Sequence, residues 1–536
     1  MSRRVFRIRE VATAERTDVS KDRDANGETV ERNLRQETMV GRARSTLGHA
    51  VCGIGKGLSV AVLACGLMPL SSAETPVLPA TKPAQLVSYW MELCRSPNLA
   101  QMTKWLTANL SEEAEKRFPA ADRAQGDVEL CAVNGGFRAV EVTKSEPNVI
   151  SVRSIGVESG VWFTQTFILN GAGKLDRTGL FPSAPVESAL PTDLSDAAIA
   201  SEVKDTITKV SRTGLFSGIV TVARGTRIIA SASGGYADHD RKTLITGATQ
   251  FTLGSMGKMF TAVSVGQLVD QGKVSFDDTV GRFFPEYPNR AVRDNVTVGM
   301  LLSHTAGMGD FLAKRTPDMM KKGVERAAEF MPLYDKDELQ FAPGTNWAYS
   351  NAGLALAGAI VEKVSGEDYP SYIRKHIFAA AGMTNSDPNN IPHATATLVT
   401  PYTKQTAHGP ASDWHEAEHD IGSPAGGAIS TADDLVRFAD ALRVGKLVSK
   451  KTFEEMTKPR GNPPGAKYGY GMDIEDLYGR TIVGHGGGFP GVSTHLYLLL
   501  DSPYTVVVLA NQDPPADAYA GSKIVALMAE KAKLGK

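Results

Sequence analysis

Apolar and polar positions follow two different periods over residues 74–181. Residues 83–94 and 99–110 carry apolar side chains three and four positions apart, which predicts two amphipathic helices. Four later segments alternate or form short β-branched runs between turn residues, namely 137–146, 149–156, 161–170 and 174–182. This order predicts a small α+β domain in which helices pack on an antiparallel sheet.

A proline-rich segment, residues 182–193, predicts a linker before a larger domain over residues 194–536. That domain opens with an amphipathic helical pattern, and a final helix is expected from about Ala516. Strand patterns lie near both of its ends, at 217–225, 226–237, 481–488, 493–501 and 504–512. We therefore expect one antiparallel sheet built from both ends of the domain and flanked by helices. A mainly helical subdomain should lie beside it, with a site in the cleft between them.

Residues 1–73 have the order of a secretory leader. Basic residues precede an apolar run from Leu58 to Leu70, and small residues follow it up to Ala73. Cleavage near Ala73 would give a periplasmic or secreted protein. Translation from Met39 and a lipid anchor at Cys65 are alternatives. No other stretch is long and apolar enough to span a membrane, so no stable span is expected after removal of the signal.

Two cysteines, Cys94 and Cys131, remain after cleavage of this leader. In an oxidising compartment they could form a disulfide, and two buried free thiols are the alternative.

The overall charge of the chain bears on the kinds of partner that it could bind. The 536 residues carry a formal net charge of -1, so no basic excess favours binding of nucleic acid. A length of this order predicts more than one domain, and 42% hydrophobic residues suffice for a large core. Partners must therefore be inferred from local sites, and the oligomeric state stays open.

Ser255 and Lys258 stand at the start of a predicted buried helix. Positions three apart share one face of a helix, so Lys258 would lie beside Ser255. Burial lowers the pKa of a lysine towards the range in which it accepts a proton. The alternative is that Ser255 only caps the helix. The same spacing recurs at Ser201 and Lys204, where the apolar helix face excludes both residues, so that pair is expected at the surface.

Tyr349 and Asn351 lie at the head of another apolar helix. A tyrosinate near ammonium groups could act as a general base, and the Asn351 amide could bind both Lys258 and a substrate carbonyl. A helix-capping asparagine beside a packed tyrosine is the alternative.

His485, Gly487 and Gly488 belong to the glycine run "GHGGG" at the end of a predicted strand. Such a run lets a substrate approach the backbone and exposes N–H groups to an oxyanion. His485 could contact a polar substrate group or transfer a proton. The alternative is a hairpin turn.

Together the three motifs, in this order, resemble the serine β-lactamase and penicillin-binding-protein superfamily over residues 194–534, in its class C-type branch. Four further segments match that branch, namely 301–308, 343–358, 423–442 and 468–475. The resemblance implies a serine β-lactamase-like α/β (α+β) fold and acyl transfer to water through an acyl-serine, with no metal or organic cofactor. The layout of residues 74–181 is similar to the cystatin-like or NTF2-like domains ahead of some exported hydrolases.

The resemblance also implies roles for the motif residues. Ser255 would be the acylated nucleophile and Lys258 its first proton acceptor. Tyr349 would relay the proton to the leaving group and activate water for deacylation. Asn351 would hold the substrate carbonyl, and the backbone N–H groups of Ser255 and Gly488 would form the oxyanion hole.

His485 departs from the β-lactamase pattern, which has a lysine there to bind the β-lactam carboxylate. An imidazole binds carboxylate less firmly at neutral pH, so the departure favours esterase or peptidase activity. Gly487 belongs to the same motif and is expected at the substrate-binding surface. His304 matches a structural signature of the family, which implies a hydrogen-bonded histidine that holds a loop.

The predicted function is that of an exported serine hydrolase acting on an ester, amide or peptide, with a cell-wall peptide as one candidate substrate. A true β-lactamase and a penicillin-binding sensor that does not deacylate are alternatives. A zinc peptidase is a third, because His415, Glu416 and His419 form a His-Glu-x-x-His sequence, with His408 near as a further ligand. The segment is rich in helix breakers, which favours a surface loop.

Overall fold

The computed structural model describes residues 76–316, 319, 326–388, 397–406, 409–417, 422–460 and 467–534. The leader predicted over residues 1–73, with its cleavage site near Ala73 and the alternatives at Met39 and Cys65, lies outside these residues. Residues 74–536 fall into one compact unit. Across the described residues, no helix combines the length and the apolar character that crossing a membrane requires.

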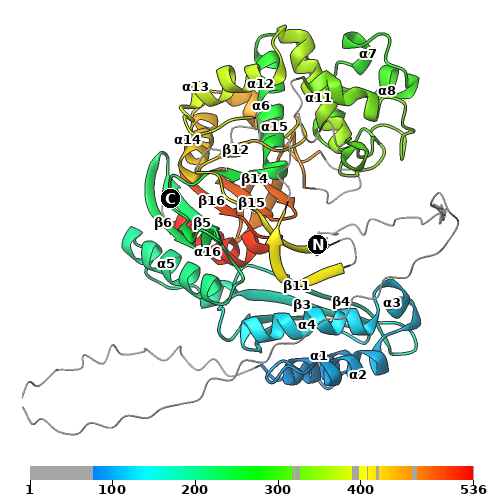
Figure 1. Cartoon of the computed structure of the whole chain (residues 1–536), viewed down its shortest axis with the longest axis vertical. Coiled ribbons are helices and arrows are strands. Elements are labelled where there is room, and N and C mark those ends of the chain that lie inside the picture. The colour runs from blue at the N-terminus through cyan, green and yellow to red at the C-terminus, as the bar shows by residue number, and fades with distance from the viewer. Residues whose placement is uncertain are drawn as a thin grey trace, which may run out of the picture. The chain divides into compact units, whose positions relative to one another are not determined.

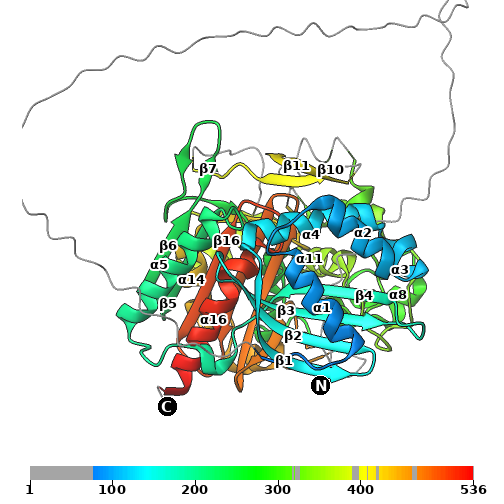
Figure 2. The same ribbon diagram turned by 90° about the horizontal axis from the view of Figure 1, so that it is seen from below.

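The N-terminal domain consists of helices followed by an antiparallel sheet. Its helices are α1 (Lys82–Leu93), α2 (Leu99–Asn109), α3 (Glu112–Arg117) and α4 (Ala120–Asn134). Its strands are β1 (Phe137–Glu146), β2 (Val149–Gly156), β3 (Trp162–Leu169) and β4 (Leu175–Pro182), paired in that order. Figure 2 shows α1 lying over the sheet, where it contacts β2 and β3.

The two helices and four strands predicted for this domain are confirmed, but the sequence patterns missed α3 and α4. Helix α3 has only six residues. Helix α4 buries Ala120, Ala124, Cys131 and Asn134, and carries Gly126 in its interior. Small and polar buried positions give no apolar stripe at helical spacing, so the pattern did not reveal this helix.

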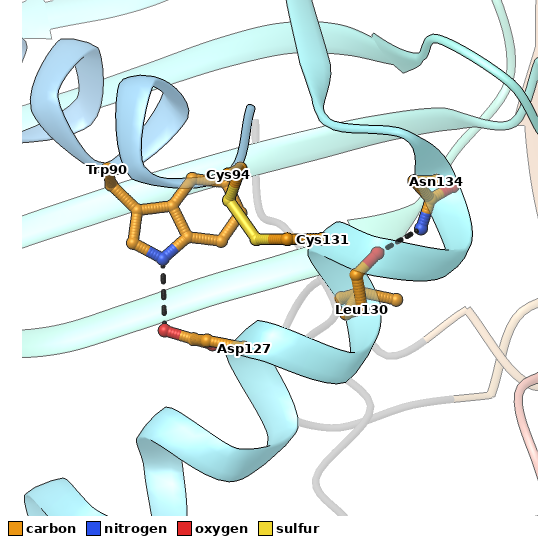
Figure 3. The surroundings of a disulfide bond; sticks show 6 residues. All are labelled: Trp90, Cys94, Asp127, Leu130, Cys131 and Asn134. Atoms are coloured by element: carbon orange, nitrogen blue, oxygen red, sulfur yellow. Dashed lines mark hydrogen bonds between the residues drawn. A yellow bond between two sulfur atoms is a disulfide. The ribbon is translucent and has the colours of Figure 1, made fainter. Parts of the chain in front are cut away.

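A disulfide joins Cys94, at the end of α1, to Cys131 on α4 (Figure 3). Of the two alternatives that the sequence left open, the structure therefore shows a disulfide and not two free thiols. Beside it the Trp90 Nε1–H donates to Asp127 Oδ2 at 3.0 Å (Figure 3). Loss of solvation on burial raises the pKa of the Asp127 carboxyl to about 6, while the bond from Trp90 and the charge of Arg123 act in the opposite direction.

Asp127→Asn is expected to stabilise the protein at neutral pH. A carboxyl whose folded-state pKa is raised binds its proton more tightly in the folded state, so stability falls as pH rises from about 4 to about 6. The asparagine oxygen still accepts from Trp90 but carries no charge. We expect a melting temperature a few degrees above wild type at pH 7.5, with the difference gone at pH 4.

Differential scanning calorimetry at both pH values measures this effect. Asp122→Asn, an exposed change on the same helix, is the control and should show no such pH dependence. A variant that melts below wild type at pH 7.5 would contradict the expectation.

The larger domain is built on a six-stranded antiparallel sheet of order β13-β14-β15-β16-β5-β6. The strands are β5 (Gly218–Arg224), β6 (Arg227–Gly234), β13 (Asp473–Leu477), β14 (Arg480–Phe489), β15 (Val492–Leu499) and β16 (Tyr504–Ala510). Strand β16 pairs with β5, with Val508 opposite Val220. The predicted sheet from both ends of the domain is therefore confirmed.

Alternate residues of the central strands enter two separate cores. Ile219 and Leu509 pack with helices α6 (Lys258–Asp270) and α14 (Ala432–Arg443). Val220 and Val508 pack on the other face with α5 (Asp196–Arg212) and α16 (Ala516–Leu534). Because successive side chains of a strand point to opposite faces, these strands are apolar throughout. Figure 1 shows α5 and α16 on one side of the sheet and α6 and α14 on the other.

Short elements complete the larger domain. Its other α-helices among the described residues are α7 (Val280–Phe283), α8 (Arg290–Asn295), α9 (Val298–Leu302), α11 (Asn351–Ser365), α12 (Tyr369–Tyr372), α13 (Ala379–Ala381) and α15 (Lys450–Met456). The remaining strands are β7 (Tyr236–Asp238), β8 (Thr243–Leu244), β9 (Phe251–Thr252), β10 (Tyr402–Thr406), β11 (Gly409–Glu416) and β12 (Ile429–Ser430). Helices therefore dominate between the two groups of strands, as predicted.

The N-terminal domain shares the core that lies on the α16 face of the sheet. The rings of Phe163 and Tyr519 lie 6.0 Å apart within it. The proline-rich segment between the domains is bound to the larger domain. The Tyr478 hydroxyl donates to the Pro185 carbonyl at 2.6 Å, and Lys533 pairs with Glu187 at 2.6 Å.

Candidate active site

Ser255 lies in a single 3-10 turn, Gly254–Gly257, directly ahead of α6. Neither the turn nor α6 is capped by a side-chain hydrogen bond at its start. The alternative in which Ser255 only caps the helix is therefore wrong, and its hydroxyl contacts Lys258 instead.

Two glycines let strand β14 pass close to this turn. A Cβ added to Gly487 would lie 1.8 Å from the Leu253 carbonyl oxygen, so no side chain fits there. Gly254 has a φ of +55°, and a Cβ added to it would lie 3.3 Å from the Gly488 nitrogen. The backbone of Gly488 thus runs beside the Ser255 turn. The glycine run is part of β14, and the hairpin-turn alternative is wrong.

Lys258 is fully buried, and its Nζ connects the first two motifs. It donates to Ser255 Oγ at 3.1 Å and to Asn351 Oδ1 at 2.7 Å. It also donates to the Ala425 carbonyl, and it lies 4.7 Å from the centre of the Tyr349 ring. The sequence predicted Lys258 beside Ser255 but missed Ala425, although residues 423–442 matched the family pattern. In contrast, Ser201 and Lys204 are exposed, as predicted.

Asn351 is the first residue of α11, but Ser350 caps this helix by accepting from the Gly353 N–H at 2.9 Å. The capping alternative for Asn351 is therefore wrong. Its Nδ2 donates to Asp310 Oδ2 at 2.7 Å. The amide is thus oriented with its oxygen towards Lys258 and its NH2 group towards Asp310, a residue that no sequence motif indicated.

Tyr349 is the residue before the α11 cap. Burial raises the pKa of its hydroxyl well above the ordinary value, a hydrogen bond with Ser255 lowers it, and the charges of Asp473 and Asp310 raise it further. Tyr349 is accordingly a phenol in the free protein. The structure favours this form over the tyrosinate expected from the sequence.

His304 holds the loop that carries Tyr349. Its Nδ1 accepts from the Ser350 N–H at 3.0 Å, and its carbonyl accepts from the Ala348 N–H at 3.0 Å. Its ring lies 4.4 Å from the Tyr349 ring, centre to centre. The loop-holding histidine expected from the resemblance is confirmed.

His485 is buried, and both of its ring nitrogens have partners. Because a carbonyl can only accept, the Nδ1–H donates to Gly486 O at 2.6 Å, and Nε2 accepts from the Tyr468 hydroxyl at 2.9 Å. Loss of solvation and the charge of Lys258 lower the pKa of His485 to about 3. The imidazole is therefore neutral at pH 7 and supplies no cation to a substrate. Tyr468 lies in a family-like segment, residues 468–475, but nothing in the sequence indicated this contact.

The zinc alternative requires a helix, and the structure shows a strand instead. His415 and Glu416 end β11, with His415 opposite Thr403 of β10, and both side chains are exposed. Consecutive strand residues point to opposite faces, so the helical arrangement of the motif is wrong here. His408 and His419 lie outside the described residues. In the part of the chain that the structure describes, no three His, Cys, Asp or Glu side chains are grouped to hold a metal ion.

The chain is similar to known proteins in sequence and in fold. A family model described as Beta-lactamase matches residues 199–529. A penicillin-binding protein of Bacillus subtilis (strain 168) is 30% identical over 314 residues, covering 56% of this chain and 68% of that one. A D-aminopeptidase of Cereibacter sphaeroides is 25% identical over 331 residues, covering 59% of this chain and 61% of that one.

A solved structure agrees with these matches. The penicillin-binding protein from Bacillus halodurans has a TM-score of 0.51 and 28% identity, covering 64% of this chain and 100% of that one. The chain is a serine hydrolase that belongs to the beta-lactamase family.

Proposed function

We propose that this protein is an exported acyl hydrolase that cleaves an ester, amide or peptide through an acyl-Ser255 intermediate. The observation that carries the proposal is the buried Lys258, which lies 3.1 Å from Ser255 Oγ and is also bound by Asn351. A lysine is costly to bury without partners, and here its partners are a hydroxyl nucleophile and the amide of a second motif.

In the proposed reaction, the Lys258 amine in its uncharged form takes the Ser255 proton as Oγ attacks the substrate carbonyl. The backbone N–H groups of Ser255 and Gly488 stabilise the oxyanion. Tyr349, a phenol in the free protein, gives its proton to the leaving group and recovers one from Lys258. Water then attacks the acyl-serine by the reverse proton transfers, and the acid is released.

The neutral His485 favours ester and amide substrates over β-lactams. A β-lactam carboxylate needs a positive partner, and His485 is uncharged with its Nε2 occupied by Tyr468. The name of one relative, D-aminopeptidase, points to peptide substrates. Asn351 and Gly487 would line the substrate path, with Asn351 holding the substrate carbonyl.

Export is supported by the Cys94–Cys131 disulfide, because disulfides persist in oxidising compartments. The order of the leader, basic then apolar then small residues, points the same way.

Intact-mass spectrometry after exposure to a fluorescent penicillin and, separately, to p-nitrophenyl butyrate tests the proposal. We expect turnover of the butyrate and no lasting penicillin adduct. The same spectrum should show the mass of a chain that begins after Ala73 and contains the disulfide. A stable penicilloyl adduct without turnover would identify a sensor, and rapid penicillin hydrolysis a true β-lactamase. If neither compound acylates the protein, the proposed reaction is wrong.

A further inference from the structure

Asp310 is an exposed residue one hydrogen bond away from Asn351, which in turn binds Lys258. Its Oδ1 accepts from the Leu312 N–H at 2.9 Å, and its Oδ2 accepts from Asn351 Nδ2 at 2.7 Å. The other end of the same amide accepts from Lys258 at 2.7 Å. The carboxylate is therefore linked to the lysine through a single amide group and still faces solvent. A flip of the amide would place its oxygen against Asp310, so the two charges fix its orientation.

The charges around the site leave a substrate cation better placed than a substrate anion. Among the described residues, the charged groups that act on Tyr349 include Asp310 and Asp473, both negative. Lys258 is the cation there, but it is buried and bound to Ser255, Asn351 and Ala425. His485, at the position where the related β-lactamase motif has lysine, is neutral. A substrate carboxylate would meet Asp310, whereas a substrate ammonium would pair with it.

We propose that Asp310 determines specificity by binding a protonated amine on the acyl side of the substrate, so that aminoacyl amides and esters are preferred over uncharged acyl groups. The inference rests on the proposed function. The position of the amine is inferred from Asn351. One N–H of its amide would hold the substrate carbonyl and the other donates to Asp310, so a group bound by Asp310 lies close to that carbonyl. A carboxylate and an ammonium form a charge-assisted hydrogen bond, and a site built for that bond discriminates against analogues that lack the amine.

Binding of the ammonium also assists the reaction. Asp310 is one of the two carboxylates that raise the pKa of Tyr349. A cation beside Asp310 offsets that charge and makes the proton of the phenol easier to transfer to the leaving group. A substrate that carries the amine should therefore have a higher kcat as well as a lower KM.

The test compares p-nitroanilides of the same acyl skeleton in three forms. These are the free amine (alanine p-nitroanilide, both enantiomers), its N-acetyl derivative, and propionyl p-nitroanilide, which lacks the nitrogen. For the wild type we expect a kcat/KM for the free amine at least about tenfold above the other two compounds. The preference should decline as pH rises through about 8, where an α-amine loses its proton. Tyr349 keeps its proton through this window, because burial raises the pKa of its hydroxyl well above its ordinary value.

Two variants separate the charge of Asp310 from its hold on Asn351. Asp310→Asn keeps an oxygen that can accept from Asn351 Nδ2 but removes the charge, so the preference for the amine should fall to near unity. Asp310→Ala also removes the hold on the amide, so all three rates should fall. Asp433→Asn, an exposed change at the start of α14, is the matched control and should keep the wild-type preference.

Absence of a preference in the wild type, or a preference that survives in Asp310→Asn, would overturn the inference. So would turnover of p-nitrophenyl butyrate with all the anilides inert. Failure of the proposed function itself gives a different result, because the butyrate would then also be inert and no acyl-Ser255 mass would appear.

Discussion

Ser255→Ala should abolish turnover while the protein stays folded, with kcat reduced by about 10⁴-fold or more. The reason is geometric. The Ser255 hydroxyl is the group that lies both 3.1 Å from Lys258 Nζ and beside the backbone of Gly488. Alanine removes the oxygen to which the acyl group would be attached. Release of p-nitrophenol from p-nitrophenyl butyrate measures the loss of turnover. Intact-mass spectrometry measures the loss of the acyl adduct.

The chain contains its own control for this experiment. Ser201 has the same spacing to Lys204 but lies exposed on α5, so Ser201→Ala should leave kcat and the acyl adduct unchanged. The melting temperatures of both variants should match that of the wild type. Residual activity in Ser255→Ala, or an adduct on another residue, would show that the nucleophile has been assigned incorrectly.

Lys258→Met should slow acylation by about 10²- to 10⁴-fold, the range that removal of an acid–base group usually produces. Methionine fills most of the volume of the lysine but neither accepts the Ser255 proton nor donates to Asn351 and Ala425. Two buried oxygens then lose a charged donor, which costs stability, while removal of a buried charge offsets part of that loss. The effect on the chemical step should thus exceed any effect on folding.

Single-turnover kinetics with p-nitrophenyl butyrate isolate the acylation rate from deacylation. Lys204→Met on the exposed face of α5 is the matched control and should behave as wild type. An acylation rate within a few-fold of wild type in Lys258→Met, with the protein still folded, would remove Lys258 from its role as proton acceptor.

Local patterns predicted the elements well where a strand or helix has a regular apolar face. The strands at the two ends of the larger domain were found because their side chains reach a core on one or both faces. Helix α4 was missed because the residues that it buries are small or polar. The His-Glu-x-x-His sequence offered a zinc site only as an alternative, and a surface loop was favoured; the structure instead shows a strand up to Glu416.

The sequence by itself determined the sheet from both chain ends, the family resemblance and the proximity of Lys258 to Ser255, because a spacing of three residues on a helix is a local property. Only the tertiary structure decided what surrounds that pair. Asn351 is 93 residues from Lys258 and Ala425 is 167 residues from it, and no local pattern encodes such approaches. The structure also showed that Ser255 stands in a tight turn without capping the helix. It showed that burial and the charge of Lys258 keep His485 neutral, that Tyr468 occupies the His485 Nε2, and that Asp310 holds the Asn351 amide. Charge and hydrogen bonding at a buried site depend on which groups the fold brings within about 3 Å of each other, and that is a property of the whole chain.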